Sequence, residues 1–366
     1  MKEYRVAHID TQTTWRGGER QALELIKGLN AKGLRNILVC KSGSDISRRA
    51  GRENIDIRHL PLRGEWDVIS MYRLRSILLS ESIDIIHAHT SHGHMIGLMA
   101  KTGLPSCHLV VSRRVDFHVY NLFSRTFKYG AGVDKILAVS DAIKRVLVED
   151  GIPESRVVTV RSGFVPHEFI SRGQSVNLRE KLGISSETTV IATVAALAPH
   201  KALHVLLKAA SIVCKTRKDV VFLIAGDGEL RSVLEKNINS LLLGESVILV
   251  GFINDIGSVY ESADIFCLSS REEGLCTSIL DAMYFRLPIV STNAGGIPEL
   301  VKNRVNGLIV PVDNHQLLAE RLLELVDDPL LRKEMGERGR NLVEQNNMEQ
   351  TVDKTFLVYK SLIENS

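Results

Sequence analysis

Short, almost continuous apolar runs alternate with longer stretches of helical periodicity along most of this chain. Strands that are apolar on both faces and are joined through amphipathic helices are typical of parallel sheets covered on both sides. The stretch 19–32, for example, gathers its apolar residues on one helical face. In the first part of the chain we predict strands at residues 5–10, 36–41, 56–62, 84–89, 108–114, 135–140 and 156–161.

The alternation stops once and then begins again, which predicts two domains. Few large apolar residues occur between 166 and 177, and we place a linker near 164–185. A second series of strands is predicted at 190–197, 220–225, 247–251, 265–269, 288–292 and 307–311. We therefore expect an α/β protein with two Rossmann-like parallel-sheet domains that face a cleft. The predicted domains are 1–165 and 166–347, with the helical stretch at about 348–366 as a candidate to pack back on the first.

Composition narrows the protein classes that this chain can belong to. The 366 residues suit two domains, and no run approaches the roughly 18 apolar residues of a membrane span. The N-terminal residues lead into a predicted strand, so we expect no signal peptide. Five scattered cysteines argue against a disulfide framework and favour the cytoplasm.

Charge is distributed unevenly between the two predicted domains. Residues 1–170 contain 25 Lys and Arg against 18 Asp and Glu, whereas residues 171–366 contain 21 against 25. Such asymmetry indicates a negatively charged partner for the first half, or chance scatter. The segment 117–129 adds five aromatic residues, together with Arg125 and Lys128. That segment fits a lipid interface, with a buried helix face as the alternative.

Ligands of parallel sheets bind beyond the carboxyl ends of the strands, so residues at these ends are candidates for a site. In the first half, Gly17 and Gly18 follow the first strand and open a helix, where backbone can approach an anion. Arg113 and Arg114 end the fifth strand and could bind phosphate or carboxylate, or form a solvated basic edge.

Four histidines fall between His87 and His94 at the end of the fourth predicted strand. Their spacing is close to that of a metal-dependent hydrolase, but Ser91 stands where that pattern has an aspartate, and no second ligand cluster is evident. We therefore favour core or substrate-lining histidines at His87 and His89, and we expect His92 and His94 in the first turn of a helix.

In the second half, Lys201 lies near the start of a helix, and Gly226 and Gly228 form a turn after a strand. The richest segment is 269–283, where a strand ends at Ser269 and a helix opens near Thr277. Free backbone N–H groups there could hold a diphosphate, and a carboxylate could bind sugar hydroxyls.

With these motifs in this order, the chain resembles glycosyltransferase family 4, which has the GT-B fold. The resemblance covers essentially the whole chain. It implies transfer of a sugar, with retention of configuration, from a nucleotide-diphosphate sugar bound mainly by the second domain to an acceptor bound mainly by the first. It also implies that Glu273 contacts the donor sugar, that Asp281 contacts the ribose, and that Lys201 holds the diphosphate.

By this resemblance, Glu273 and Lys201 are the predicted catalytic residues. The predicted donor-binding residues are Gly17, Gly18, His89, Arg113, Arg114, Gly226, Gly228, Phe252, Gly274, Leu275, Cys276, Thr277, Ser278 and Asp281. The chain departs from the family at three places. Asp281 replaces a glutamate, Ala202 stands where glycine is usual, and Ala196 stands where many members have an arginine, a charge that Arg113 or Arg114 could supply.

The expected partners are a UDP- or GDP-sugar, a glycan or glycolipid acceptor and, peripherally, an anionic membrane, with no nucleic acid. No cofactor and no essential divalent metal are expected, because a lysine, helix N-termini and glycine N–H groups can stabilise a diphosphate leaving group. We expect a cytoplasmic enzyme, at the inner face of the cytoplasmic membrane, of bacterial-type cell-envelope polysaccharide or lipopolysaccharide synthesis. The alternatives are a non-hydrolysing nucleotide-sugar epimerase, a metal-dependent hydrolase that uses the histidine run, and a non-catalytic nucleotide-sugar binding subunit.

Overall fold

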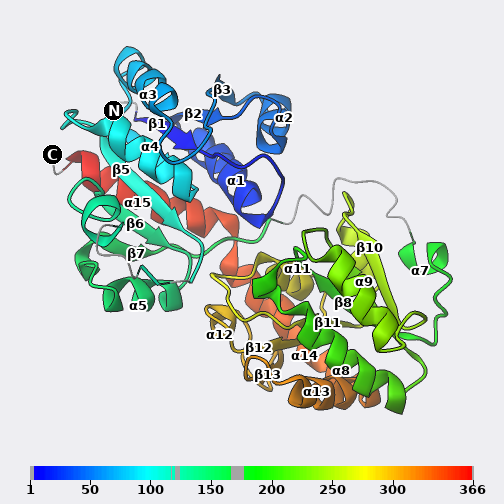
Figure 1. Ribbon diagram of the computed structural model, residues 1–366. Helices are drawn as coiled ribbons and strands as arrows, with labels where there is room; N and C mark the ends of the chain where they lie inside the picture. Colours follow the sequence, from blue (N-terminus) through cyan, green and yellow to red (C-terminus); the bar gives the residue numbers. More distant parts are fainter. Residues whose placement is uncertain (1–3, 117, 120–123, 166–176, 365–366) are drawn as a thin grey trace. The chain divides into compact units, whose positions relative to one another are not determined.

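The computed structural model describes residues 4–116, 118–119, 124–165 and 177–364, and the chain forms two compact units (Figure 1). Unit 1 comprises Met1–Gly163 and Asn347–Ser366, and unit 2 comprises Phe164–Asn346. Each unit is built on one parallel sheet, of seven strands in unit 1 and six in unit 2. The predicted α/β class with two Rossmann-like parallel sheets is therefore confirmed. Half of the predicted linker at 164–185, namely residues 166–176, lies outside the described residues.

Unit 1 alternates strands and helices, and the last helix of the chain completes it. Its elements are β1 (Arg5–Ile9), α1 (Gly17–Ala31), β2 (Arg35–Cys40), α2 (Asp45–Arg52), β3 (Asp56–His59), α3 (Val68–Ser80), β4 (Ile85–Ala88), α4 (Ser91–Lys101), β5 (His108–Arg113), η1 (Ser124–Lys128), β6 (Lys135–Ala138), α5 (Asp141–Glu149), η2 (Glu154–Arg156), β7 (Val157–Thr159) and α15 (Met348–Glu364).

The strand order of unit 1 is β3-β2-β1-β4-β5-β6-β7. The order reverses at β1 and β4, which are neighbours, and loops at such a point diverge to opposite faces of the sheet. Both strands are almost entirely buried, as expected for the continuous apolar runs in the sequence. In the parallel register, His8 of β1 lies beside His87 of β4.

Helix α15 packs on the sheet of unit 1 next to α1, as the red helix in Figure 1 shows. Val352 and Tyr359 of α15 belong to one buried cluster with Leu25 and Leu29 of α1. The helices approach so closely that a Cβ atom at Gly28 would lie 2.3 Å from Val352 Cγ2. The far C-terminal segment therefore belongs to the core of unit 1.

Unit 2 repeats the strand and helix alternation. Its elements are α7 (Leu178–Lys181), β8 (Thr189–Val194), η3 (Pro199–Lys201), α8 (Leu203–Thr216), β9 (Val220–Ala225), α9 (Arg231–Ser240), β10 (Val247–Gly251), α10 (Gly257–Glu261), β11 (Ile265–Leu268), α11 (Thr277–Tyr284), β12 (Ile289–Thr292), α12 (Ile297–Leu300), β13 (Gly307–Val310), α13 (His315–Asp327), α14 (Pro329–Val343) and η4 (Glu344–Asn346).

The strand order of unit 2 is β10-β9-β8-β11-β12-β13, so its order reverses at β8 and β11. The main core of this unit lies between its sheet and helices such as α8 and α13. Several helices begin at a side chain that accepts a backbone N–H, as Asn314 does for α13. Among the described residues, no helix has both the length and the apolarity that are needed to cross a bilayer.

Candidate functional site

The predicted site residues of unit 2 gather at the carboxyl ends of four adjacent strands, β10, β9, β8 and β11. Phe252 follows β10 and is 58% exposed, and the turn with Gly226 and Gly228 follows β9. Lys201 lies in the loop after β8, and Glu273 lies in the loop after β11. Because β8 and β11 are neighbours, these two loops meet at one edge of the sheet.

Lys201 and Glu273 contact each other directly. Lys201 Nζ lies 2.5 Å from Glu273 Oε1, and the two side chains are 15% and 8% exposed. Ser270 Oγ donates to the same carboxylate oxygen at 2.7 Å. The Glu273 carbonyl oxygen also accepts the N–H of Gly296, at 3.1 Å. An ion pair this buried holds both side chains in place, and removing either partner leaves the other charge uncompensated.

The backbone next to Lys201 explains why glycine suits the following position. Ala202 has φ 45° and ψ 40°, a left-handed conformation that favours glycine. Ser269 Oγ, at the end of β11, donates to the carbonyl oxygens of Lys201 and Ala202 at 3.0 and 3.2 Å. These hydrogen bonds hold the loop in its strained conformation at the point where α8 begins.

Gly226 and Gly228 are required by the packing of two loops. Gly226 has φ 135°, and a Cβ atom there would lie 1.9 Å from the carbonyl oxygen of Ala195. At Gly228 the same atom would lie 2.6 Å from the carbonyl oxygen of Leu197. Leu197 N also donates to Asp227 O at 3.1 Å. The turn after β9 therefore lies against the loop that leads to Lys201.

Helix α11 begins directly beside Glu273. Thr277 and Ser278 occupy its first turn and are half-buried, whereas Gly274, Leu275 and Cys276 precede it and are buried. Burial raises the pKa of the Cys276 thiol to about 11, so this group is uncharged near neutral pH. Asp281 lies one turn further along and is 4% exposed. The first N–H groups of a helix can bind an anion, and Lys201 adds a positive charge to the same edge.

In unit 1, the predicted residues also follow adjacent strands. Gly17 and Gly18 are the first residues of α1, and Gly18 lies against Arg114, whose Cδ would be 3.7 Å from a Cβ atom there. Arg113 is buried and donates to Tyr129 Oη at 3.0 Å. Its guanidinium is therefore held within unit 1 by an internal partner, which we did not foresee.

Arg114 belongs to a cluster with two acids that the sequence analysis missed. Burial raises the pKa of Asp10 to about 6, and nearby Arg114 opposes this shift. Burial and the neighbouring Asp10 raise the pKa of Glu19 to about 7. Asp10 Oδ2 and Arg114 Nε are buried without a hydrogen-bond partner. Asp10 follows β1 and Glu19 lies in the first turn of α1, so the acids flank the predicted glycine loop.

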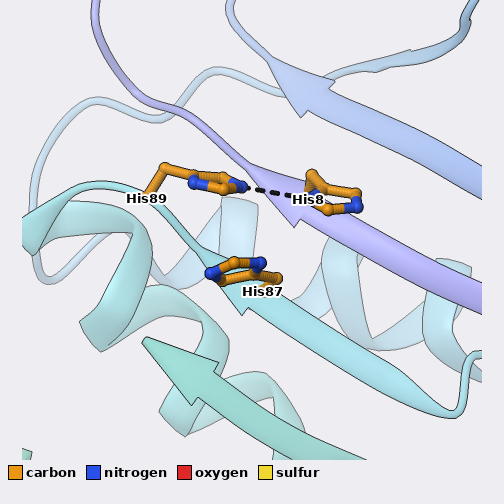
Figure 2. Close-up of side chains that lie close together, drawn as sticks. All are labelled: His8, His87 and His89. Carbon is orange, nitrogen blue, oxygen red and sulfur yellow. Dashed lines mark hydrogen bonds between the residues drawn. The ribbon is translucent and has the colours of Figure 1, made fainter. Parts of the chain in front are cut away.

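His87 and His89 form a buried cluster with His8, a residue that our sequence analysis did not consider (Figure 2). His8 Nδ1 lies 3.0 Å from His89 Nε2, and His8 Nε2 lies 3.0 Å from Asn36 Oδ1. Burial lowers the pKa of all three imidazoles, to about 4 for His8, so they are neutral near pH 7. The parallel pairing of β1 with β4 brings them together.

The three imidazoles could in principle hold a metal ion, because one nitrogen from each lies within 4.8 Å of the others. Five of their six nitrogens, however, already have hydrogen-bond partners within the protein, and His89 Nδ1 is buried without one. His87 Nδ1 lies 2.6 Å from Tyr359 Oη, and His87 Nε2 lies 2.8 Å from Ser112 Oγ. This hydrogen bonding accounts for buried, neutral histidines and favours a structural role for them.

His94 and His92 lie in the first turn of α4, where the sequence placed them. His94 is buried, and burial lowers its pKa to about 3. His92 is exposed. The four-histidine run therefore sends its side chains into different surroundings and does not form a single cluster.

Two family profiles match the chain, one over its N-terminal part and one over its C-terminal part. "Glycosyltransferase Family 4" matches residues 15–167, and "Glycosyl transferases group 1" matches residues 175–342. The chain is a family 4 glycosyltransferase. It is therefore an enzyme that transfers sugars, and its two parallel sheets are those of the GT-B fold.

Relatives that are named for a specific activity align with this glycosyltransferase over most of its length. The UDP-Gal:alpha-D-GlcNAc-diphosphoundecaprenol alpha-1,3-galactosyltransferase of Escherichia coli is 25% identical, over 99% of this chain and 98% of that protein. The N-acetyl-alpha-D-glucosaminyl L-malate synthase of Bacillus anthracis is 24% identical, over 81% and 80%. Among solved structures, Anabaena Alr3699/HepE in complex with UDP and glucose has a TM-score of 0.86 and 18% identity, and the match covers 98% of this chain and 100% of that one.

Proposed function

We propose that this glycosyltransferase moves a sugar from a UDP-sugar to a hydroxyl of a glycan or glycolipid acceptor, with retention of the anomeric configuration. The observation that carries the proposal is the contact between Lys201 and Glu273 beside the N-terminus of α11. A cation, a carboxylate and free helix N–H groups are the elements that bind a diphosphate and a sugar. All three belong to unit 2, at the edge where β8 and β11 end.

In this proposal, Lys201 and the first turn of α11 stabilise the negative charge that develops on the departing diphosphate. Glu273 contacts the donor sugar, and Asp281 binds the ribose. Because Lys201 is paired with Glu273, a diphosphate that binds Lys201 replaces part of that pairing. A nucleoside diphosphate is already a good leaving group, so the reaction needs little general-acid help and no essential metal. We favour attack of the acceptor from the leaving-group face over double displacement through an enzyme carboxylate.

The choice of UDP over GDP is supported by named relatives. The Escherichia coli relative uses UDP-Gal by its name, and Anabaena Alr3699/HepE was solved with UDP-glucose. A Corynebacterium glutamicum relative that is 34% identical over 45% of this chain is named as dependent on GDP-mannose, so GDP is the alternative. We further propose a role in cell-envelope glycan synthesis at the cytoplasmic face of the membrane. The diphosphoundecaprenol-linked acceptor in the name of the Escherichia coli relative supports that role.

The donor is tested by thermal unfolding of the full chain with UDP, GDP, ADP and their common sugar conjugates, in the presence of a chelator. A ligand that binds only the folded protein raises the unfolding temperature by mass action. We expect UDP and one UDP-sugar to raise it and GDP to leave it unchanged. A rise with GDP alone would change the donor assignment to a GDP-sugar. In a separate arm without chelator, a rise with Zn²⁺ and none with any nucleotide would favour the metal-dependent hydrolase.

The site is tested by measuring turnover in variants of its residues and in control variants of nearby exposed residues. Glu273→Gln and Lys201→Gln should each lower kcat/KM by about 100-fold or more, because they remove electrostatic stabilisation of the transition state. Glu272→Gln and Lys208→Gln change exposed residues nearby and should keep full activity. Activity is measured at a temperature at which circular dichroism shows each variant folded. Unchanged turnover in Glu273→Gln or Lys201→Gln would overturn the site.

The reaction itself is tested by product analysis. Retention predicts that proton NMR finds the same anomeric configuration in donor and product, and an inverted product would contradict this part of the proposal. Conversion of the nucleotide sugar without any acceptor would instead support the epimerase. Donor binding without turnover across an acceptor panel would support a non-catalytic binding subunit.

A further inference from the structure

Helix α3 of unit 1 carries apolar side chains on the side that faces solvent. Trp66, directly before the helix, and Val68, Ile69, Tyr72 and Leu79 within it are between 52% and 73% exposed. We call these five residues the α3 outer face. They make up five of the fourteen large hydrophobic side chains that are exposed in the described part of the chain, although they span only residues 66–79. The exposure is therefore concentrated on one element.

The core of unit 1 does not account for the α3 outer face. The opposite side of the helix is already buried through Leu74 and Leu78, four positions apart, and α3 packs there against α4. A surface helix of a soluble protein normally has one apolar stripe and a polar face that meets water. Helix α3 carries large apolar side chains on its outer side as well, between the exposed polar residues Arg73, Ser76 and Ser80, and this pattern suits a partner at that side.

The charges around the α3 outer face favour an anionic partner. Arg63 and Arg73 are exposed beside it. The neighbouring acids are held by groups of the protein itself: Glu65 by Lys128 at 2.5 Å, Asp67 by the N–H groups of Arg63 and Ser70, and Glu81 by Arg58 at 2.7 Å. Unit 1 as a whole carries 27 Lys and Arg against 20 Asp and Glu.

We propose that the α3 outer face lies on the surface of an anionic lipid bilayer. Trp66 and Tyr72 have an apolar body and a polar tip, which suits the headgroup level, while Val68, Ile69 and Leu79 reach the acyl boundary. Arg63 and Arg73 then lie among lipid phosphates. The inference rests on the proposed function in one respect, since a lipid-borne acceptor would be found at the same surface.

This surface differs from the segment 117–129 that the sequence suggested. Phe117 and residues 120–123 of that segment lie outside the described residues. In the remainder, Tyr129 is buried and stacks edge-on against His94. Lys128 is also buried and pairs with Glu65 beside Trp66. The described part of the segment thus contacts the residues just before α3 through the pair of Lys128 and Glu65, and Phe127 within it is 40% exposed.

A lipid surface fits the α3 outer face better than a second protein does. A helix of 13 residues is about 20 Å long. Stable protein interfaces use about 20–30 residues on each side, far more than this single helix face offers. In the α3 outer face, aromatic residues and flanking arginines surround aliphatic residues, and these three kinds of side chain match the layers of an anionic bilayer. A bilayer surface, unlike a protein partner, does not need a complementary shape.

The test measures binding of the full chain to vesicles of equal parts phosphatidylglycerol and phosphatidylcholine by sedimentation. Replacing both aromatic residues, Trp66→Ser with Tyr72→Ser, should lower the partition coefficient by about tenfold or more, because buried aromatic area is lost. Arg73→Gln should lower it about fivefold, an effect that high salt removes. The control, Leu242→Ser with Leu330→Ser, removes the two most exposed leucines of unit 2 and should change nothing.

A spectroscopic measurement places the helix directly. Trp15→Phe leaves Trp66 as the only tryptophan of the chain. Its emission should shift to the blue with these vesicles and should be quenched by brominated lipids. Wild-type partitioning of the aromatic double variant, or an unshifted Trp66, would overturn the inference. Loss of self-association in that variant, with vesicle binding unchanged, would instead assign the face to a second copy of the chain.

The outcome is separable from the proposed function, because the proposed donor residues Lys201 and Glu273 lie in unit 2. The aromatic double variant should keep its UDP-induced rise in unfolding temperature and its turnover of a water-soluble acceptor. Failure of vesicle binding with normal turnover rejects the membrane surface alone. Normal vesicle binding without any transfer rejects the proposed function alone.

Discussion

Asp10→Asn should change how the stability of unit 1 depends on pH. Asp10 Oδ2 is buried without a partner, and burial raises the pKa of this carboxyl from 3.8 to about 6. The substitution keeps an oxygen that can accept the N–H of Gln12, which lies 2.9 Å from Asp10 Oδ1. It removes the charge that the buried position disfavours above its pKa.

The magnitude follows from the shift in pKa. A carboxyl whose pKa is raised by folding stabilises the folded state fully below its unfolded pKa, and this contribution is lost as the pH rises through the folded value. A rise from 3.8 to about 6 corresponds to about 3 kcal/mol. Between about pH 4 and pH 7.5, the free energy of unfolding of Asp10→Asn should therefore rise by about 3 kcal/mol relative to the wild type. The substitution also removes the negative charge that raises the pKa of Glu19, and this effect adds to the same rise in the free energy of unfolding.

Urea unfolding followed by tryptophan fluorescence measures this difference. Both tryptophans, Trp15 and Trp66, belong to unit 1, so the signal reports that unit. Comparison with the wild type at each pH cancels the opposite pH dependence of the buried histidines. Asp56→Asn, at an exposed position of the same unit, is the control. If Asp10→Asn and Asp56→Asn have the same pH dependence, the desolvation argument for Asp10 is refuted.

Three further predictions test the packing inside each unit. Lys201→Met should lower the free energy of unfolding by about 3 kcal/mol, because it leaves the buried Glu273 carboxylate without its positive partner. Adding Glu273→Gln should recover most of this loss, and a double-mutant cycle measured by urea unfolding and circular dichroism tests the coupling between the two residues. Gly226→Ala should prevent stable folding of unit 2, because its Cβ would lie 1.9 Å from a carbonyl oxygen, and a wild-type melting curve would contradict this. Tyr359→Phe removes the hydroxyl 2.6 Å from His87 and should cost about 1–2 kcal/mol in urea unfolding by fluorescence, whereas an unchanged midpoint would show that the bond contributes nothing.

The sequence predicted secondary structure and fold class wherever hydrophobicity follows a regular pattern along the chain. Continuous apolar runs such as 220–225 identify strands that are buried on both faces, and this local signal was enough to predict two parallel sheets. Helix starts could also be predicted, since α11 begins at Thr277 as expected. Such features depend on neighbours within a few residues.

The reason for the glycine turn after β9 could not be predicted. Gly226 and Gly228 suggested an approach to a ligand, but their missing side chains make room for backbone of the loop after β8. The two loops are about thirty positions apart in the sequence, and nothing in either indicates that they touch. The ligand role of these glycines stays a prediction.

The sequence by itself determined the class of fold and which residues stand at the strand ends, because burial on both faces of a strand imposes a pattern on adjacent residues. Tertiary structure decided which of those ends are neighbours. It placed His8 beside His87, Tyr359 against the same ring, and Lys201 against Glu273. It also decided the pKa values of Asp10 and Glu19, since desolvation is a property of the surroundings that folding creates.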